Sequence, residues 1–420
     1  MRRTPGNRHV SGRYEPHERS VDADVAGAVG RVLTRELRDR VDEAAGIDAV
    51  FAQDVAERVA RFALGGKRMR SQFLWWGLRA AHPGAVREQV GGALRIGAAL
   101  ELLQTCALVH DDVMDGSALR RGRPSVHREL DVQYGSPNAA GAGGSFGDAG
   151  AILVGDLALA WADDMVADTE LAAGTRRGVL GVWRAIRAEM VAGQYLDLHG
   201  QATGSRSAVR AIRIACLKSA LYSVERPLAL GAALAGADGS VTAALCAAGR
   251  PAGIAFQLRD DLLSVFGDPV DTGKPCGEDI RQGKPTYLIT VARERAEAAD
   301  DHAGTAFLDA ALGDAELSDD ALARVRECLV STGARAAVEA RIAELVEQSA
   351  AHLAAAGGIA DAPRARLLDL FQRVAAGRDT TGGQRPHRAE AVPAAAGTAA
   401  ATPGGTAGAR LEALAGGDAR

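Results

Sequence analysis

The chain has 420 residues, 47% of them hydrophobic and only 4% aromatic, with a formal net charge of -4. That length can support one large hydrophobic core or two modest ones. The charge, and the lack of a basic stripe with interleaved aromatic residues, argue against nucleic-acid binding. Ala and Leu dominate, β-branched runs are short and long stretches lack Pro, which predicts an all-α protein.

In chain order, residues 1–20 are rich in Arg, Gly, Pro and His, and residues 377–420 consist largely of Ala, Gly, Thr, Pro and Arg. We expect a disordered lead-in and a flexible tail there. Between them, residues 21–376 show successive helical patterns and are expected to form a single helical domain. Two breaks stand out, residues 135–150 and 267–284, and both are rich in glycine and predicted to lack helix.

The cysteines and the chain start indicate the compartment. The five cysteines have no paired spacing, so neither a zinc site nor a disulfide framework is predicted. No apolar stretch follows the Arg-rich start, so we expect no signal peptide. The most apolar run, residues 151–162, is too short to span a membrane. A cytoplasmic protein without a membrane span is therefore expected.

Lysine is rare, with four lysines beside 45 arginines: Lys67, Lys218, Lys274 and Lys284. All four lie in distinctive segments, most of them close to glycine. A lysine offers a compact ammonium with three donors where a planar guanidinium would not fit. Phosphate oxygens are one such partner. Codon bias is the alternative explanation for any one of them, but the four together indicate phosphate contacts.

Two aspartate clusters point to a metal site. Asp111, Asp112 and Asp115 follow a helical stretch at residues 94–109, and a spacing of four places Asp111 and Asp115 on one helix face. Asp260 and Asp261 end a second helical run. One such pair is usually a solvated face, but burying two pairs without a cation would be costly. Carboxylate oxygens suit a hard ion such as Mg²⁺.

Further charged residues extend this pattern. Asp197 lies on a helix that we expect to begin near Gly181. Arg120 and Arg121 follow Asp115 closely, and an arginine can bind phosphate oxygens through two donors. By itself, an Arg-Arg-Gly turn such as the one at Arg120 is more often part of a surface loop. Beside the aspartates, it indicates two diphosphate groups, one bound through metal and one held by cations alone.

In combination, the segment from Gly65 to Arg70, both aspartate clusters and the lysine-bearing segments resemble the trans-isoprenyl diphosphate synthases, or polyprenyl synthetases, most closely a bacterial geranylgeranyl diphosphate synthase. The resemblance covers residues 65–284. It implies an all-α helical bundle of the isoprenoid synthase type with a central active-site cavity, and a homodimer. It also implies Mg²⁺, about three ions with substrate bound. The implied reaction condenses isopentenyl diphosphate with dimethylallyl, geranyl or farnesyl diphosphate.

The resemblance also assigns roles to individual residues. The contacts to isopentenyl diphosphate are Lys67, Arg70, Gln104 and Arg121. The contacts to the allylic diphosphate are Arg120, Lys218, Ser219, Gln257, Lys274 and Lys284. The Mg²⁺ ligands are Asp111, Asp112, Asp115, Asp197, Asp260 and Asp261. The groups expected to promote departure of the diphosphate are Asp111, Asp115, Lys218 and Asp260.

Three positions qualify this assignment. Ser264 stands where the second aspartate motif usually has a third Asp, so fewer metal ligands are expected there unless Asp268 or Asp279 compensates. Ser71 replaces a proline that is common in the family, a change expected to be harmless. His110 could act as a general base, but a histidine ending an apolar helix is more often structural. The proton is therefore expected to leave with the released pyrophosphate.

Product length can be predicted from the helix that carries Asp111. The residues four and five positions earlier are Ala107 and Cys106, which lie roughly 6–8 Å deeper at the helical rise. Both are small, and Leu103 one turn further could form a partial floor. Unless residues of a facing helix intervene, the product should exceed fifteen carbons, and we predict C20 geranylgeranyl diphosphate.

Two other functions fit parts of the pattern. A class I terpene cyclase would share the first aspartate motif, but it would not need the second diphosphate site that Lys67, Arg70 and Arg121 supply. A non-catalytic regulatory subunit usually loses one aspartate motif, whereas here only Ser264 departs from the pattern.

Overall fold

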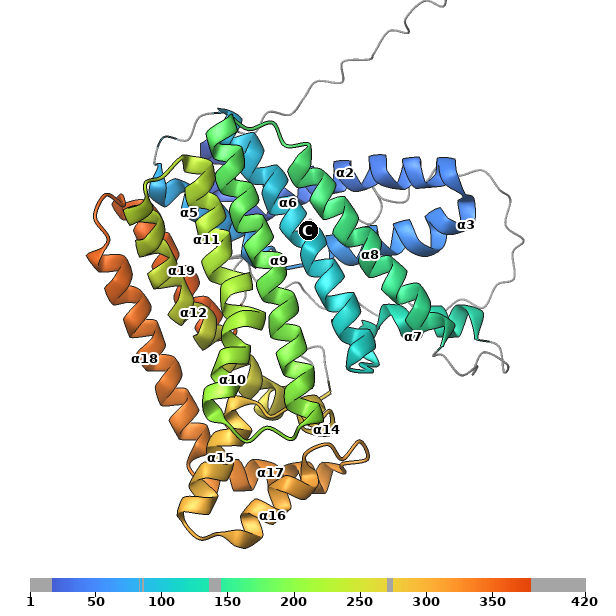
Figure 1. Cartoon of the computed structure of the whole chain (residues 1–420), viewed down its shortest axis with the longest axis vertical. Helices are drawn as coiled ribbons and strands as arrows, with labels where there is room; N and C mark the ends of the chain where they lie inside the picture. Colours follow the sequence, from blue (N-terminus) through green and yellow to red (C-terminus); the bar gives the residue numbers. More distant parts are fainter. Residues whose placement is uncertain (1–16, 83, 85–86, 136–144, 270–274, 379–420) are drawn as a thin grey trace, which may run out of the picture.

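The structure, a computed structural model, describes residues 17–82, 84, 87–135, 145–269 and 275–378. In this part of the chain, helices joined by turns and short loops form the fold. The strands present there are those of one antiparallel hairpin, in which β1 (Leu119–Arg120) pairs with β2 (Arg123–Pro124). Figure 1 shows the helices gathered around a central one, α6 (Arg87–Met114). The predicted all-α class is confirmed.

The remaining helices follow in three groups. The N-terminal group comprises α1 (Glu18–Ala23), α2 (Val25–Ile47), α3 (Ala49–Phe51), the π-helical η1 (Ala52–Ala56) and α4 (Glu57–Leu64). The central group comprises α5 (Met69–Ala81), α6, α7 (Val126–Tyr134), α8 (Phe146–Ala167), α9 (Ala173–Ala202), α10 (Ala208–Ala215), the π-helical η2 (Cys216–Glu225), α11 (Arg226–Ala235) and α12 (Gly239–Phe266). The C-terminal group comprises α14 (Glu278–Arg281), α15 (Tyr287–Ala298), α16 (His302–Ala311), α17 (Asp319–Ser331), α18 (Ala334–Ala355) and α19 (Asp361–Ala375).

Helix α6 forms the centre of the core because apolar residues occupy all of its faces, the pattern of a buried helix. Leu94, Ile96, Leu100 and Leu103 are at most 2% exposed. Neighbouring helices α2, α5 and α8 pack against it. Within the described residues, this is the one helix with the length and hydropathy of a membrane span, and 78% of that apolar stretch is buried in the protein.

A second hydrophobic cluster lies where the C-terminal helices meet α12. Leu288 of α15, Leu329 of α17 and Val338 of α18 are fully buried there. Figure 1 shows α15, α16 and α17 at the lower end of the molecule. This end carries α14 and the segment after it, which reach toward the end of α6.

Sequence patterns located the helices better than their ends. The helix predicted at residues 94–109 is longer in both directions, and the helix of Asp197 begins at Ala173 rather than near Gly181. In the predicted break at residues 135–150, α8 starts at Phe146. Ser145 caps it by accepting a hydrogen bond from the Asp148 amide in a capping box.

Two further boundaries differ from expectation. Helix α1 begins at Glu18, inside the expected lead-in of residues 1–20, whereas residues 1–16 and 379–420 lie outside the described residues. The prediction that residues 267–284 lack helix is wrong, because α14 forms there. Gly277 adopts a left-handed φ of 77° before it, and two acidic residues in its first turn favour a helix N-terminus.

Candidate active site

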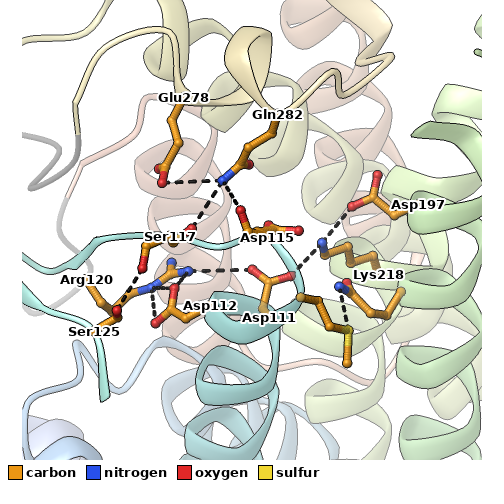
Figure 2. A network of polar contacts seen from close by, with 12 residues as sticks. Asp111, Asp112, Asp115, Ser117, Arg120, Ser125, Asp197, Lys218, Glu278 and Gln282 are labelled. Carbon is orange, nitrogen blue, oxygen red and sulfur yellow. Dashed lines mark hydrogen bonds and ion pairs between the residues drawn. The ribbon is translucent and has the colours of Figure 1, made fainter. Parts of the chain in front are cut away.

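Lys218 joins carboxylates from two helices. Its ammonium donates to Asp111 Oδ1 at 3.0 Å and to Asp197 Oδ2 at 2.7 Å, as Figure 2 shows. Gly193 makes this meeting possible, since a Cβ there would lie 2.4 Å from the Lys218 amide nitrogen. The α9 backbone therefore contacts η2 directly, and Asp197 follows one helical turn after the contact.

Three cations control the ionisation of Asp111. Burial by itself would raise the pKa of this carboxyl group, but Lys218, Lys284 and Arg120 together hold the pKa well below its usual range. Asp111 thus remains ionised throughout the physiological range. A permanently charged carboxylate at the end of α6 is what a divalent cation requires as a ligand.

Arg120 is bound to Asp112 rather than pointing freely into the site. Its Nε donates to Asp112 Oδ1 at 2.8 Å and Oδ2 at 3.1 Å, and a terminal nitrogen makes a further contact with Oδ1. The same guanidinium lies 3.6 Å from Asp111 Oδ2. Asp112 is 1% exposed. The predicted metal ligand Asp112 is therefore occupied in holding Arg120 beside Asp111 (Figure 2).

Lys284 and Gln282 attach the segment after α14 to the end of α6. Lys284 Nζ donates to Asp115 Oδ2 at 2.6 Å, while Asp115 Oδ1 is buried without a hydrogen-bond partner. The Gln282 amide donates to the Asp115 carbonyl and to Ser117 Oγ, both at 3.2 Å (Figure 2). Burial and the charge of Asp111 raise the pKa of Asp115. Asp115 therefore has a free acceptor that a cation could use.

The donor set fits Mg²⁺ bound together with a phosphate. Within the described ranges, no three His, Cys, Asp or Glu side chains gather closely enough to hold a metal by themselves. Mg²⁺ commonly takes one or two carboxylates and completes its shell with water and substrate phosphate oxygens. The orphaned Asp115 oxygen and the ionised Asp111 match that requirement, and they lie one helical turn apart.

The second aspartate motif is connected to Ser219, the residue after Lys218, through a hydrogen-bonded chain. Ser219 donates to the Gln257 side-chain carbonyl, and the Gln257 amide donates to Asp261 Oδ1 at 2.8 Å. Asp260 is exposed, whereas Asp261 is 6% exposed. Burial, followed by the charge of Asp279, raises the pKa of Asp261 well above its ordinary value. The structure thus brings Ser219, Gln257 and Asp261 together.

Ser264 adds no oxygen ligand to this motif. Its hydroxyl donates to the Asp261 carbonyl at 2.9 Å, and its own carbonyl accepts from Gly277. Of the two acids proposed to compensate, Asp279 lies 3.7 Å from Lys284, and its charge acts on Asp261. Asp268 instead lines a cleft beside Phe266 and Arg326. Asp279 is the better placed of the two.

A second cationic group lies between the start of α5 and the hairpin. Arg70 donates to Ser223 Oγ at 2.8 Å, and Lys67 is exposed. Arg121, at a φ of 54°, donates to the Phe62 carbonyl at 3.1 Å. A Cβ on Gly65 would lie 3.1 Å from the Arg121 guanidinium, so the glycine loop and the hairpin are adjacent.

The fourth predicted contact of this group, Gln104, has its side-chain carbonyl oxygen buried without a hydrogen-bond partner. Arg68, next to Lys67, is buried and paired with Glu101 at 3.2 Å, so it stabilises the loop. Ser71, in place of the usual proline, donates to Glu101 Oε1 at 2.8 Å. The substitution adds a bond between α5 and α6. Lys274 lies outside the described residues.

His110 faces α8 rather than Lys218. Its Nε2 lies 3.1 Å from the Ile152 carbonyl oxygen, and its Nδ1 lies 3.7 Å from Cys106 Sγ. Gly155 leaves room for the ring, because a Cβ there would lie 2.2 Å from Nε2. Cys106 is 4% exposed, in the same helix contact. The structural interpretation of His110 is favoured over a catalytic base.

Sequence reasoning missed Tyr222 and Gln282. Tyr222 lies one turn after Lys218 with its ring against Arg70, and Gln282 lies two residues before Lys284. The sequence offered one signal for them, namely that each lies within four residues of a predicted diphosphate contact, Lys218 or Lys284. Tyrosine and glutamine are too common on helices and loops for that signal to have been decisive.

The comparisons with known proteins agree with this geometry. The family model described as polyprenyl synthetase matches residues 53–328. The chain belongs to the polyprenyl synthetase family. The predictions of a trans-prenyltransferase and of the isoprenoid synthase fold are thereby confirmed.

Two curated relatives illustrate the range of this synthetase family. A geranylfarnesyl diphosphate synthase from Aeropyrum pernix is 31% identical over 310 residues, covering 73% of this chain and 88% of that protein. A geranylgeranyl diphosphate synthase from Mycobacterium tuberculosis is 34% identical over 251 residues, 58% of this chain and 63% of the relative.

Among solved structures, a geranylgeranyl pyrophosphate synthase from Corynebacterium glutamicum, complexed with isoprenyl diphosphate and magnesium, superposes with a TM-score of 0.78. It is 37% identical, and the match covers 83% of this chain and 99% of that one.

Proposed function

We propose that this polyprenyl synthetase condenses isopentenyl diphosphate with an allylic diphosphate and releases pyrophosphate. The observation that carries the proposal is the presence of two separate cationic groups beside one set of carboxylates. Lys218, Lys284 and Arg120 bond to the aspartates of α6, whereas Arg70 and Arg121 bond to Ser223 and to the Phe62 carbonyl. Two diphosphates, only one of them adjoining the metal-binding carboxylates, account for both groups.

The allylic diphosphate is the leaving group. Lys218, Lys284 and Arg120 donate to its oxygens and stabilise the charge that develops as the carbon–oxygen bond breaks. Lys274, Ser219 and Gln257 are the further proposed contacts. Bound Mg²⁺ would supply charge neutralisation to the leaving diphosphate. Its proposed ligands, for about three ions with substrate bound, are Asp111, Asp115, Asp197, Asp260 and Asp261, while Asp112 holds Arg120 beside them.

The double bond of isopentenyl diphosphate then attacks the allylic cation. Lys67, Arg70, Gln104 and Arg121 hold the second diphosphate so that the double bond faces the cationic carbon, which is catalysis by orientation. A proton leaves the condensed product and passes to the released pyrophosphate. His110 is not needed for this step, in keeping with its contact with α8.

For the product we propose C20 geranylgeranyl diphosphate. Ala107 and Cys106 present no aromatic floor below Asp111, and Leu103 is fully buried one turn deeper. Relatives with the names geranylgeranyl and geranylfarnesyl diphosphate synthase support a long product. Another relative is a farnesyl diphosphate synthase from Mycobacterium tuberculosis, 34% identical, so a C15 product is the competing outcome.

We also propose a cytoplasmic homodimer. All five cysteines are free, as a reducing compartment favours. Helix α8 exposes Phe146, Ile152 and Leu153, which are 50%, 45% and 58% exposed, and apolar side chains of this kind favour contact with a second copy.

One assay separates the proposed reaction from its two rivals. Purified protein is incubated with Mg²⁺, labelled isopentenyl diphosphate and an allylic primer, and the products are separated by chain length. Label in a prenyl diphosphate supports the synthase. Pyrophosphate released with an unlabelled hydrocarbon would indicate a class I terpene cyclase, and no turnover would indicate a regulatory subunit.

A further inference from the structure

We propose that Tyr222 and Ser223 of η2 are positioning residues for isopentenyl diphosphate, which they serve by holding the Arg70 guanidinium in place. The inference rests on the proposed function, which assigns Arg70 to that diphosphate. Tyr222 and Ser223 are not proposed to touch either substrate. They act through Arg70.

Arg70 is held by neutral groups alone. Its guanidinium carbon lies 4.2 Å from the centre of the Tyr222 ring, and a terminal nitrogen donates to Ser223 Oγ at 2.8 Å. No carboxylate in the described part of the chain lies within ion-pair distance of it. Its Nε is buried without a partner. A fixed positive charge without a counter-ion is prepared for an anion that arrives from solution.

The neighbouring Arg68 shows the contrast. It is buried against Glu101 at 3.2 Å and donates to the carbonyls of Ala63 and Leu64. All of these partners are groups of the protein itself, and the charge of Arg68 is compensated by Glu101. Two arginines two positions apart thus have opposite surroundings, and only Arg70 keeps its charge available.

The ring of Tyr222, rather than its hydroxyl group, supports Arg70. The side chain is 3% exposed, and its hydroxyl oxygen is buried without a hydrogen-bond partner. Burial raises the pKa of Tyr222, so the ring stays neutral. A neutral aromatic face attracts a guanidinium through its quadrupole and restricts it to one plane. Phenylalanine should do the same.

The η2 helix consequently serves both diphosphates. Lys218 and Ser219 occupy its first half and reach the carboxylates and Gln257, whereas Tyr222 and Ser223 follow one turn later and hold Arg70. Its π-helical hydrogen bonding, which is rare and often marks functional sites, changes the direction of successive side chains compared with an α-helix.

The test compares Tyr222→Leu, Tyr222→Phe, Ser223→Ala, Arg70→Ala and the double variant Arg70→Ala/Tyr222→Leu. Calorimetry gives the dissociation constant of isopentenyl diphosphate, and steady-state kinetics give KM for each substrate. Tyr222→Leu should weaken isopentenyl diphosphate binding about tenfold, the middle of the cation–π range. KM for the allylic substrate should change less than about twofold. Tyr222→Phe should match the wild type, and Ser223→Ala should weaken binding about threefold.

The double variant decides whether Tyr222 acts through Arg70. If it does, Tyr222→Leu causes no further loss in the Arg70→Ala background. A further tenfold loss there, equal effects on both substrates, or failure of Tyr222→Phe to restore binding would overturn the inference. If Tyr222→Leu unfolds, the Phe variant and Ser223→Ala still test it. Wild-type protein that binds isopentenyl diphosphate without forming product would refute the proposed function, while the binding series would still judge the role of Tyr222.

Discussion

Replacement of Lys218 by methionine tests whether the site lysines are counter-ions for carboxylates that also bind metal. The ammonium of Lys218 bonds to Asp111 and Asp197, whose side chains are 16% and 12% exposed. Removing it leaves two largely buried charges with weaker compensation. Breaking such a pair costs about 3 kcal/mol, the lower end of the usual range, because Arg120 still lies 3.6 Å from Asp111.

That loss converts into a measurable change in Tm. About 360 folded residues at roughly 2.1 cal/mol/K each give an unfolding entropy of about 0.75 kcal/mol/K, so Tm should fall by about 4 °C without Mg²⁺. Mg²⁺ at about a hundred times its dissociation constant returns about 2.7 kcal/mol. Lys218 already neutralises these carboxylates in the wild type, which should therefore bind the free ion more weakly and gain less from it. The remaining loss of about 0.3 kcal/mol corresponds to a difference of about 0.4 °C between variant and wild type.

The assay is thermal unfolding followed by circular dichroism, with and without Mg²⁺. Arg226→Met is the matched control, since Arg226 donates to Glu189 at 2.7 Å with both side chains near 20% exposed, and neither belongs to an aspartate motif. Its Tm loss should not respond to Mg²⁺. A Lys218→Met deficit that is equally insensitive to Mg²⁺ would refute the counter-ion interpretation.

Three further predictions concern the fold and the product. Burial would raise the pKa of Asp54, but hydrogen bonds from Tyr134 and Gln133 of α7 lower it below its ordinary value. The ionised carboxylate therefore stabilises the folded protein at neutral pH, and this stabilisation is lost as the pH falls through the pKa of the folded state. Asp54→Asn should therefore cost about 2 kcal/mol at pH 7 and less at pH 3 in denaturant titrations; an equal cost at both would contradict this. Gly155→Ala should destabilise by about 2 kcal/mol through its clash with His110, and His110→Ala in the same chain should recover most of the loss. Cys106→Phe or Ala107→Phe should shorten the product, and an unchanged chain length in product analysis would place the floor elsewhere.

The sequence was sufficient for features that depend on local spacing. Asp111 and Asp115 share a face because they are four residues apart on a helix, and the structure has them at the end of α6 as expected. The range that the family model matches, residues 53–328, contains both aspartate motifs. Composition and residue spacing therefore predicted the fold class, whereas the roles of the site residues stay predictions.

Pairings between distant elements could not be predicted in this way. Lys218 and Asp111 are 107 positions apart, and their contact depends on Gly193 bringing α9 against η2. The attachment of Arg120 to Asp112 depends on a left-handed residue in the hairpin, and the Arg70–Tyr222 contact depends on a π-helix. Each is set by tertiary packing, which leaves no periodic signal in the sequence.

The central claim is that two diphosphates occupy separate cationic groups, and one kinetic comparison tests it most directly. Lys67→Met and Lys218→Met are assayed with isopentenyl diphosphate and an allylic primer varied independently. We predict that Lys67→Met raises KM for isopentenyl diphosphate about tenfold with kcat nearly unchanged, whereas Lys218→Met lowers kcat about a hundredfold through lost stabilisation of the leaving group. If both variants change the same kinetic constant for the same substrate, the two-site account is contradicted.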